Sequence, residues 1–331
     1  MKKLLRIGTR DSQLAVWQAN LVKEALQKKG FESELVYIKS DGDIDLVTPL
    51  YELGVQGIFT KTLDAALLNN RIDLAVHSMK DVPTQLAKGL QQTAVLARAS
   101  YKDILVYKGD EKALFENLGI VNGEWSMVTG ESLPIAHSPF TTHHSPLTIA
   151  TSSVRRKAQW LNRYPHHRMD NLRGNVNTRL RKLEESNWNG AIFAAAGLER
   201  IGLRPETSIT LDWMLPAPSQ GAILIACREG DDFAAEASAL LNDPATALCT
   251  RIEKDFLRVL MGGCTTPISA LAVIEQNRII FKGNILSLDG KKKVEIGKDV
   301  LLRDAEGLGE FAAKELLQNG ADAIIAAIRN A

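Results

Sequence analysis

The feature that most constrains the fold is a regular alternation of short apolar runs with amphipathic segments near the start of the chain. Leu4–Gly8 has the composition of a buried strand, Gln13–Lys29 places apolar residues at helical spacing, and Glu34–Lys39 is predicted as the next strand. A helix over Phe59–Asn69 and a strand over Ile72–Val76 continue the rhythm. This βαβα order predicts an α/β protein with a parallel or mixed sheet covered by helices.

The pattern weakens from Ile104 to Ile149, where glycines and prolines predict a loop-rich segment, and then resumes. The later elements that we expect are strands at Leu147–Thr151, near Met169–Leu172, at Ala191–Ala194 and at Ala222–Cys227, with helices from Ser153, from Val176 and over Ala245–Leu260. The tail predicts a separate small α+β unit, with strands at Ile268–Ile274, Arg278–Leu286 and Lys293–Leu302 and a helix from Ala305. A chain of 331 residues is long enough for two or three such domains.

Charge and apolar content exclude some classes of protein. The formal net charge of +1 gives no overall field that would draw the chain to nucleic acid or to an anionic membrane. The apolar runs, such as Ala191–Leu198, fall short of the roughly 18 residues that indicate a membrane span. Arg6 and Arg10 interrupt the apolar start before a signal peptide can form, so we expect a cytoplasmic protein.

Polar residues follow four of the predicted strands, at the points where those strands end. These four segments are Thr9-Arg10-Asp11-Ser12, His77-Ser78-Met79-Lys80-Asp81, Ser152-Ser153-Val154-Arg155-Arg156 and Arg173-Gly174-Asn175. In open α/β sheets, ligands bind in the crevice beyond the carboxyl ends of the strands. Because the excess charge of these segments is positive, we expect a negatively charged ligand between two α/β domains.

Two predicted helices also carry cations at their N-terminal ends. Ser152 or Ser153 is a candidate N-cap, which places Arg155 and Arg156 in the first turn of one helix. Asn175 caps the next helix in the same way, with Arg173 just before it and Arg179 one turn in.

Cations at such positions oppose the helix dipole by up to about 1 kcal/mol each, so stability alone would favour acidic residues there. Free helix N–H groups and guanidinium groups together make a carboxylate or phosphate site. Two alternatives stay open: a solvated basic face, and a nucleic-acid-binding stretch over 155–182, although few aromatic residues are interspersed there for base stacking.

Asp81 and Cys264 are the candidate reactive groups. A carboxylate beside Lys80 and near arginines stays ionised, and it can stabilise a developing cation and exchange protons. The spacing alone favours a plainer role for Asp81, as a helix N-cap or as half of a Lys–Asp pair. Cys264 follows two glycines and precedes Pro267, so its thiol is expected on a loop where it can be a nucleophile.

The other cysteines and the histidines give no site. Cys227 lies in an apolar strand and Cys249 in a helix, which are typical positions of packing residues. None of the three cysteines forms a C-x-x-C motif, which argues against a disulfide framework and against zinc. The histidine pairs at 143–144 and 166–167 lack metal-binding spacing, so no metal is predicted.

Taken together, these residues resemble the porphobilinogen deaminase (hydroxymethylbilane synthase) family. The matching segments, in the family's order, are Arg6–Ala15, Gly57–Lys61, His77–Pro83, Thr151–Arg156, Leu172–Leu180, Ala196–Arg200, Gln220–Ala222 and Gly262–Cys264. They span nearly the whole chain, so the resemblance covers all the predicted domains.

The resemblance implies an α/β protein of three domains, of which the first two are like type II periplasmic binding proteins around a cleft. The expected divisions are 1–98 for domain 1, with 217–240 returning to it, 99–216 for domain 2, and 241–331 for a small α+β domain 3 that carries the cofactor cysteine. The implied reaction is the head-to-tail condensation of four porphobilinogen molecules with loss of ammonia, followed by hydrolytic release of hydroxymethylbilane, in tetrapyrrole (haem) biosynthesis.

The family's site residues carry over to matching positions in this chain. A dipyrromethane cofactor is implied, joined by a thioether to Cys264, with no metal and no nucleotide. The residues implied to hold cofactor and substrate carboxylates are Arg10, Ser12, Lys80, Arg155, Arg156, Arg173, Arg179 and Arg200. Asp81 is implied to contact the pyrrole nitrogens, to stabilise the azafulvenium cation and to assist proton transfer. The other expected cleft residues are Phe59, which is implied to pack near the substrate ring, and His77, Ser78, Ser152, Ser153 and Gln220.

These implications leave one alternative function, a two-lobed protein that binds a small anion without catalysis. The expected partner is the small-molecule substrate alone, with no nucleic acid and no membrane, and the expected state is a monomer.

Overall fold

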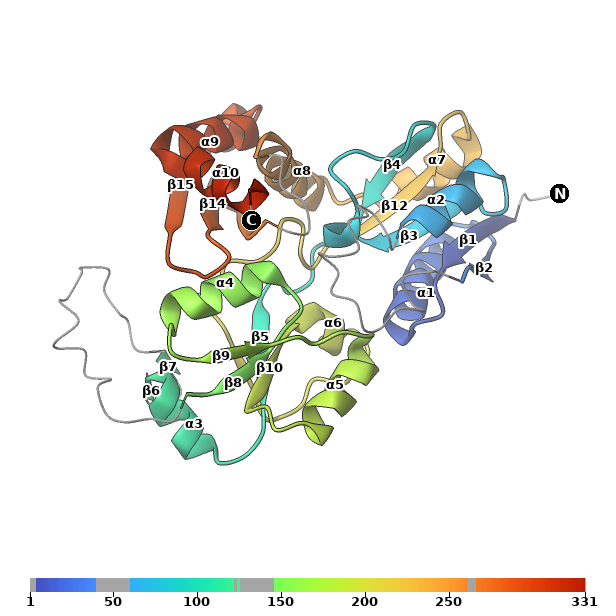
Figure 1. Ribbon diagram of the computed structural model, residues 1–331. Helices are drawn as coiled ribbons and strands as arrows, with labels where there is room; N and C mark the ends of the chain where they lie inside the picture. The colour runs from blue at the N-terminus through green and yellow to red at the C-terminus, as the bar shows by residue number, and fades with distance from the viewer. Residues whose placement is uncertain (1–3, 40–59, 122–123, 126–145, 261–265, 331) are drawn as a thin grey trace.

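A computed structural model describes residues 4–39, 60–121, 124–125, 146–260 and 266–330 of the chain. Figure 1 shows three bodies: two α/β lobes and a smaller domain that packs beside both of them. Each body has its own sheet and its own buried apolar clusters, so the α/β class predicted from the alternating pattern is confirmed.

The first lobe is a five-stranded mixed sheet in the order β2-β1-β3-β12-β4. Its strands are β1 (Leu5–Thr9), β2 (Ser33–Tyr37), β3 (Leu74–Ser78), β4 (Leu90–Val95) and β12 (Ile223–Arg228). Its helices are α1 (Gln13–Lys28), α2 (Lys61–Leu68) and α7 (Asp232–Ala239). β1 pairs in parallel with β2 and β3, whereas β12 runs antiparallel to both of its neighbours. A late segment of the chain therefore supplies an inner strand of the first sheet.

The second lobe repeats this plan with the order β11-β5-β10-β8-β9. Its strands are β5 (Asp103–Tyr107), β8 (Thr148–Ala150), β9 (Arg168–Asp170), β10 (Gly190–Ala194) and β11 (Ser208–Thr210), with a two-stranded ribbon of β6 (Ile120–Val121) and β7 (Glu124–Trp125). Its helices are α3 (Glu111–Leu118), α4 (Val154–Arg163), α5 (Val176–Glu185) and α6 (Ala195–Glu199).

The prediction of a loop-rich segment from Ile104 to Ile149 was wrong in its first part. The five residues of β5 are all buried, and α3 is a regular two-turn helix whose N-cap, Asp110, accepts a hydrogen bond from Lys112 N. β5 lies between two antiparallel neighbours with both faces covered, so it shows no alternation of polar and apolar residues. α3 has only eight residues, which is too short for a clear helical period.

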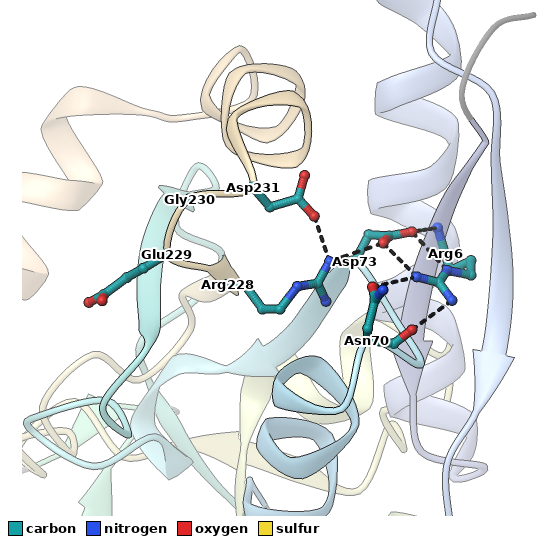
Figure 2. Close-up of a pocket in the computed structure, with 7 residues that line it drawn as sticks. All are labelled: Arg6, Asn70, Asp73, Arg228, Glu229, Gly230 and Asp231. Carbon is teal, nitrogen blue, oxygen red and sulfur yellow. Dashed lines mark hydrogen bonds and ion pairs between the residues drawn. The ribbon is translucent and has the colours of Figure 1, made fainter.

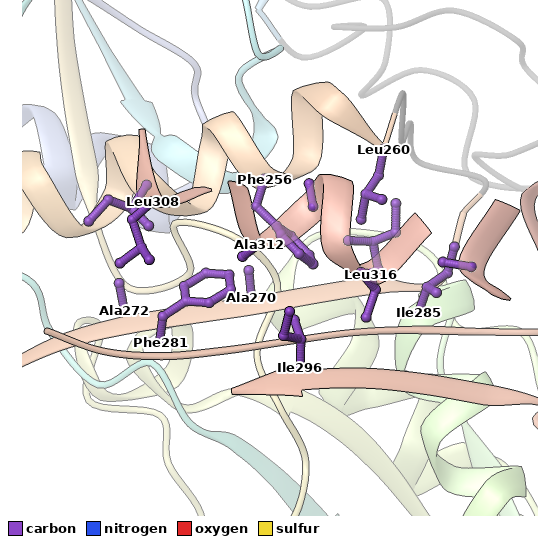
Figure 3. Close-up of a cluster of buried hydrophobic side chains, with 14 of the residues drawn as sticks. Phe256, Leu260, Ala270, Ala272, Phe281, Ile285, Ile296, Leu308, Ala312 and Leu316 are labelled. Atoms are coloured by element: carbon purple, nitrogen blue, oxygen red, sulfur yellow. The ribbon is translucent and has the colours of Figure 1, made fainter. Parts of the chain in front are cut away.

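The third domain is a helical layer on a three-stranded antiparallel sheet. Its elements are α8 (Pro244–Val259), β13 (Ile268–Glu275), β14 (Arg278–Leu286), β15 (Lys293–Leu301), α9 (Leu308–Leu316) and α10 (Asp322–Arg329). Figure 3 shows Phe256 from α8 and Phe281 from β14 meeting in its core, with ring centres 5.1 Å apart and nearly edge to face. The predicted α+β unit at the end of the chain is confirmed.

Two crossover segments join the lobes, one from β4 to β5 and one from β11 back to β12, and they touch at Gly221. Gly221 has a φ of +87°, and a Cβ there would lie 2.7 Å from the carbonyl oxygens of Ala99 and Ser100. Its own carbonyl accepts a hydrogen bond from Ala99 N at 3.1 Å. Because only glycine fits both the backbone angle and this approach, the position keeps the two crossovers in contact.

A buried carboxylate ties the crossovers to the third domain. Glu253 of α8 is fully buried and pairs with Arg98 of the first crossover at 2.6 Å. It also accepts hydrogen bonds from Ser219 N of the second crossover at 2.6 Å and from Ala272 N of β13 at 2.8 Å. One side chain thus connects both crossovers to the domain that contains α8.

No helix in the described ranges combines the length and the apolar character needed to cross a bilayer.

Candidate active site

A cavity of about 460 Å³ lies where the three domains meet. Residues from the strand ends of both lobes line it, together with Leu257, Thr266 and Ile268 of the third domain. The charged residues along its wall are Arg10, Lys80, Asp81, Arg155, Arg156, Arg173 and Arg179. The crevice predicted from the charged strand ends therefore exists, and its lining has more cations than anions.

The first lobe contributes Lys80 and Asp81 from a short 3-10 turn, Met79–Asp81, directly after β3. Lys80 Nζ donates to Gln220 Oε1 of the second crossover at 3.4 Å. Burial, aided by the charge of Arg156, lowers the pKa of Lys80 to about 8. Asp81 closes the turn and is exposed to the cavity, so it does not act as the N-cap that its spacing suggested.

Three further residues of this lobe, His77, Ser78 and Ser12, line the cavity beside the charged side chains. His77 on β3 is buried, and burial together with the charge of Arg10 lowers its pKa to about 4, so it is neutral at neutral pH. Ser78 Oγ accepts from Gln18 Nε2 at 2.9 Å. Ser12 is the N-cap of α1, where its hydroxyl accepts from Ala15 N.

The second lobe places Arg155 and Arg156 in the first turn of α4. Ser153 is the N-cap and accepts from Arg156 N at 3.4 Å, whereas Ser152 precedes it and lines the cavity. Both guanidinium groups lie against Asp103, the first residue of β5. Sequence reasoning missed Asp103, because the strand that it begins was predicted to be a loop from Ile104 onward.

Around the start of α5, Arg173 and Arg179 have donors without partners. Asn175 is the N-cap, and its side-chain oxygen accepts from Thr178 N at 2.9 Å, as predicted. Within the described residues, Arg173 Nη1 and Arg179 Nε are buried and have no hydrogen-bond partner. Burial and the neighbouring Arg156 lower the pKa of Arg179 to about 10, so it remains a cation at neutral pH. Unpaired buried donors of this kind are costly, which indicates a site built for an anionic ligand.

Arg200 differs from the other predicted carboxylate ligands. It does not line the cavity, and its Nη2 donates to Gly221 O at 2.7 Å. Its guanidinium carbon lies 5.8 Å from the centre of the Trp17 ring. Arg200 therefore lies at the contact between the lobes, and its role as a carboxylate ligand stays a prediction.

Two of the expected site residues, Phe59 and Cys264, lie outside the described residues. Thr266, two positions after Cys264, lines the cavity. Cys227 and Cys249 are buried free thiols, which confirms their prediction as packing residues. In the part of the chain that the structure describes, no group of three or more His, Cys, Asp and Glu side chains gathers in a way that could hold a metal ion.

A second cavity, of about 430 Å³, lies on the first lobe between the β1–β3 strands and the start of α7. Figure 2 shows that its two arginines and two aspartates point toward one another, while Glu229 points away. Arg6 and Arg228 both pair with Asp73, and Arg228 also pairs with Asp231 at 2.6 Å. Because these four charges balance within the cluster, this cavity has no excess positive charge to attract an anionic ligand.

Comparison with known proteins identifies the family of the chain. The family model described as "Porphobilinogen deaminase, dipyromethane cofactor binding domain" matches residues 5–236, and "Porphobilinogen deaminase, C-terminal domain" matches residues 247–318. A porphobilinogen deaminase of Chlorobium phaeobacteroides is 37% identical over 337 residues and covers 99% of each chain. One of Syntrophotalea carbinolica is 39% identical over 328 residues, covering 98% of this chain and 96% of its own length.

Among solved structures, the periplasmic VFT2 domain of BvgS from Bordetella pertussis covers 72% of this chain and 86% of its own, with 13% identity and a TM-score of 0.38. At that score the likeness supports no functional argument, and it is not evidence for the alternative of a binding protein without catalysis. The sequence matches extend over both lobes and the third domain. This chain belongs to the porphobilinogen deaminase family.

Proposed function

We propose that the cations lining the cavity hold the carboxylates of the dipyrromethane cofactor and of the growing pyrrole chain, beside Asp81 as the catalytic carboxylate. The observation that carries this proposal is the pair of buried donors, Arg173 Nη1 and Arg179 Nε, that lack partners within the described residues and line the same cavity as Asp81. Carboxylate oxygens are the acceptors that such donors fit best.

The reaction of the family accounts for the excess of positive charge. The enzyme joins four porphobilinogen molecules head to tail, with loss of ammonia at each addition, and releases hydroxymethylbilane by hydrolysis. Each pyrrole ring carries an acetate and a propionate group, so the anionic charge in the cavity grows with every addition. When bound, dipyrromethane supplies the pyrrole position to which the first substrate is joined.

The arginines divide this work according to their contacts. Arg173 and Arg179 have open donors, so they are assigned to ligand carboxylates directly. Arg156 already donates to Asp103 and to Ile192 O. Arg155 donates to Leu215 O, but its buried Nε also lacks a hydrogen-bond partner within the described residues. A guanidinium group has five N–H donors, so both retain capacity for a ligand while the protein fixes their planes. Arg10, Ser12 and Lys80 complete the proposed carboxylate-binding wall from the first lobe.

Asp81 is assigned to the chemistry because of its charge and its exposure to the cavity. Loss of ammonia leaves a cation on the substrate, and an ionised carboxylate beside it lowers the energy of that state. The same carboxylate can accept a proton from the pyrrole carbon and return one to the leaving amine. Lys80, from the same turn, and Arg179, from the second lobe, both interact electrostatically with Asp81.

The remaining assignments are also ours. The thioether to Cys264, the ring contact of Phe59 and the division into domains at 98–99, 216–217 and 240–241 are proposed on the family's pattern. The fold gives the divisions support, because β12 joins the first sheet while β5 and β11 lie in the second. We further propose a cytoplasmic monomer that acts without nucleic acid.

Intact mass of the purified protein tests the cofactor and its attachment together. The wild-type chain should exceed its sequence mass by one dipyrromethane, and Cys264→Ser should remove that excess, because serine forms no thioether. Cys249→Ser serves as the matched control and should keep the excess, since Cys249 is buried in α8. An excess mass that survives Cys264→Ser would show that the attachment point is wrong.

A further inference from the structure

Asp103 is the buried carboxylate to which both first-turn arginines of α4 are bound. It is fully buried and opens β5, just where the first crossover enters the second lobe. Arg156 donates from Nε and Nη2 to Oδ1 at 3.0 and 2.8 Å, and Arg155 Nη2 forms an ion pair with Oδ2 at 2.8 Å. Two planar guanidinium groups on one carboxylate leave little freedom for either group to rotate.

Gln220 connects Asp103 to the opposite lobe. Its Nε2 donates to Asp103 Oδ1 at 2.9 Å and to Tyr101 O at 2.8 Å, so it joins the two crossovers side by side. Its Oε1 accepts from Lys80 Nζ at 3.4 Å. A continuous chain of contacts therefore runs from Lys80 of the first lobe, through the second crossover, to Arg155 and Arg156 of the second lobe.

The charges around Asp103 show what its removal would do. Burial acts to raise its pKa, but Arg155 and Arg156 outweigh burial and lower the pKa to about 2, so Asp103 is ionised at every working pH. The charges facing Lys80 are Arg156 and Arg155 from α4, Asp103 from β5 and Asp81 from its own turn. Without Asp103, three cations would meet with one carboxylate fewer between them, and the two guanidinium groups would lose their common acceptor.

We propose that Asp103 is a positioning residue, which holds Arg155 and Arg156 in the orientation that receives the ligand carboxylates and balances the charge beside Lys80. This inference rests on the proposed carboxylate-binding role of the cavity. Asp103 does not line the cavity itself, so it acts through its neighbours.

The test compares Asp103→Asn with Asp73→Asn. Asp73 is the matched control, because it is also buried and also paired with two arginines, Arg6 and Arg228, but it lies away from the cavity. For each variant we would measure far-UV circular dichroism, intact mass, kcat and KM for porphobilinogen, and the pH profile of kcat/KM. A purely structural role would lower thermal stability in both variants and leave KM and the pH profile unchanged in both.

Asp103→Asn should raise KM by about tenfold or more, the scale of one charge-assisted hydrogen bond. The alkaline limb of its kcat/KM profile should move to lower pH by about one unit, because Lys80 loses a neighbouring negative charge. A folded Asp103→Asn that lacks the dipyrromethane mass, beside an Asp73→Asn that has it, would support the proposal as well. Wild-type KM together with a wild-type pH profile would overturn it.

Asp103→Glu keeps the inference testable if Asp103→Asn fails to fold. It retains the charge but moves the carboxylate by one methylene, so KM should rise while the alkaline limb stays at its wild-type position. An unchanged KM in a folded Asp103→Glu would refute the positioning role. Arg173→Leu distinguishes an error in the positioning role of Asp103 from an error in the proposed function. If Arg173→Leu also keeps a wild-type KM, the carboxylate-binding role of the cavity is wrong.

Discussion

The same local arrangement occurs in two places, at Asp73 in the first lobe and at Asp103 beside the cavity. Each is a buried aspartate bound by two arginines. Around Asp73, a second carboxylate on Asp231 completes a neutral cluster, as Figure 2 shows. Around Asp103, the next charges are mostly positive: Lys80, Arg173 and Arg179 line the same cavity, with Asp81 as their counterpart.

The difference shows that a buried ion pair does not by itself mark a functional site. The neutral cluster satisfies its own charges and links β1, the residue before β3 and the end of β12, so the removal of one partner should destabilise the sheet. The cavity cluster is left with uncompensated cations and open donors, which a polyanionic ligand would satisfy. We therefore propose a role in the fold for Asp73 and a role in ligand binding for the Asp103 cluster.

The largest effect that would test this contrast is expected from Asp81→Asn. The substitution keeps the shape of the side chain but removes the charge that faces the cations, so turnover should fall by roughly 10²–10⁴-fold, the range of general acid–base catalysis. The circular dichroism spectrum and the melting temperature should stay close to those of the wild type, since Asp81 is exposed. Steady-state kinetics would check this, and a variant that retains most of its wild-type rate would contradict the catalytic assignment.

Arg173→Leu should give the next largest effect, through binding. Removing a buried cation with an open donor should raise KM for porphobilinogen by about tenfold to a hundredfold or prevent assembly of the cofactor. Arg173→Lys should recover only part of this loss, because an ammonium group cannot bind a carboxylate with two parallel hydrogen bonds. Intact mass measures cofactor assembly, and initial rates measure KM. Normal product formation by Arg173→Leu would contradict the proposed role of the cavity cluster in binding.

His77→Gln tests how burial beside the charged cavity affects the pH dependence of stability. The pKa of His77 in the folded state is about 4 and its ordinary value is 6.5, so the unfolded chain binds a proton in this window that the folded chain does not. The free energy of unfolding therefore falls as pH drops from 6.5 to about 4, by up to about 3 kcal/mol from this group, because a pKa change of one corresponds to about 1.4 kcal/mol. Urea unfolding between pH 7 and pH 4.5 should show a shallower pH dependence in the variant; equal slopes would exclude the effect.

The smallest effect is expected from Arg6→Leu, in the neutral cluster. It removes one partner of buried Asp73 but leaves Arg228, and Arg6 is itself one-third exposed. The free energy of unfolding should fall by about 1–2 kcal/mol, while kcat and KM keep their wild-type values. Chemical denaturation and kinetics on the same preparation would check it. A raised KM would show that the first-lobe cluster also communicates with the cavity.

Much of the fold and of the cavity could be predicted from local sequence signals. Strand β14 has the predicted bounds, and Ser153 and Asn175 cap their helices because short polar side chains accept from N–H groups in the first turn. The position of charges directly after buried strands predicted the location of the cavity, since the sheet brings strand ends together.

What local signals could not give was the pairing between distant segments. Nothing near Asp103 indicates that it meets Arg155 and Arg156, some 50 residues later, and β5 has no alternation because both of its faces are covered. Likewise, Arg200 was grouped with the other arginines, although its contact with Gly221 O depends on how the crossovers pass each other. Such contacts depend on the tertiary arrangement, which residue type and spacing along the chain do not indicate.

The place of β12 between β3 and β4 bears on how the protein emerges from the ribosome. Translation delivers β1, β2, β3 and β4 first, but the strand that unites β4 with the rest is made only after β11, the last strand of the second lobe. The second lobe can therefore complete its sheet while the first still lacks an inner strand, which reverses the usual N-to-C order of domain folding. Until Ile223–Arg228 is synthesised, β3 and β4 each lack the strand that pairs with them in the finished sheet, and unpaired strand edges of this kind favour association with other chains.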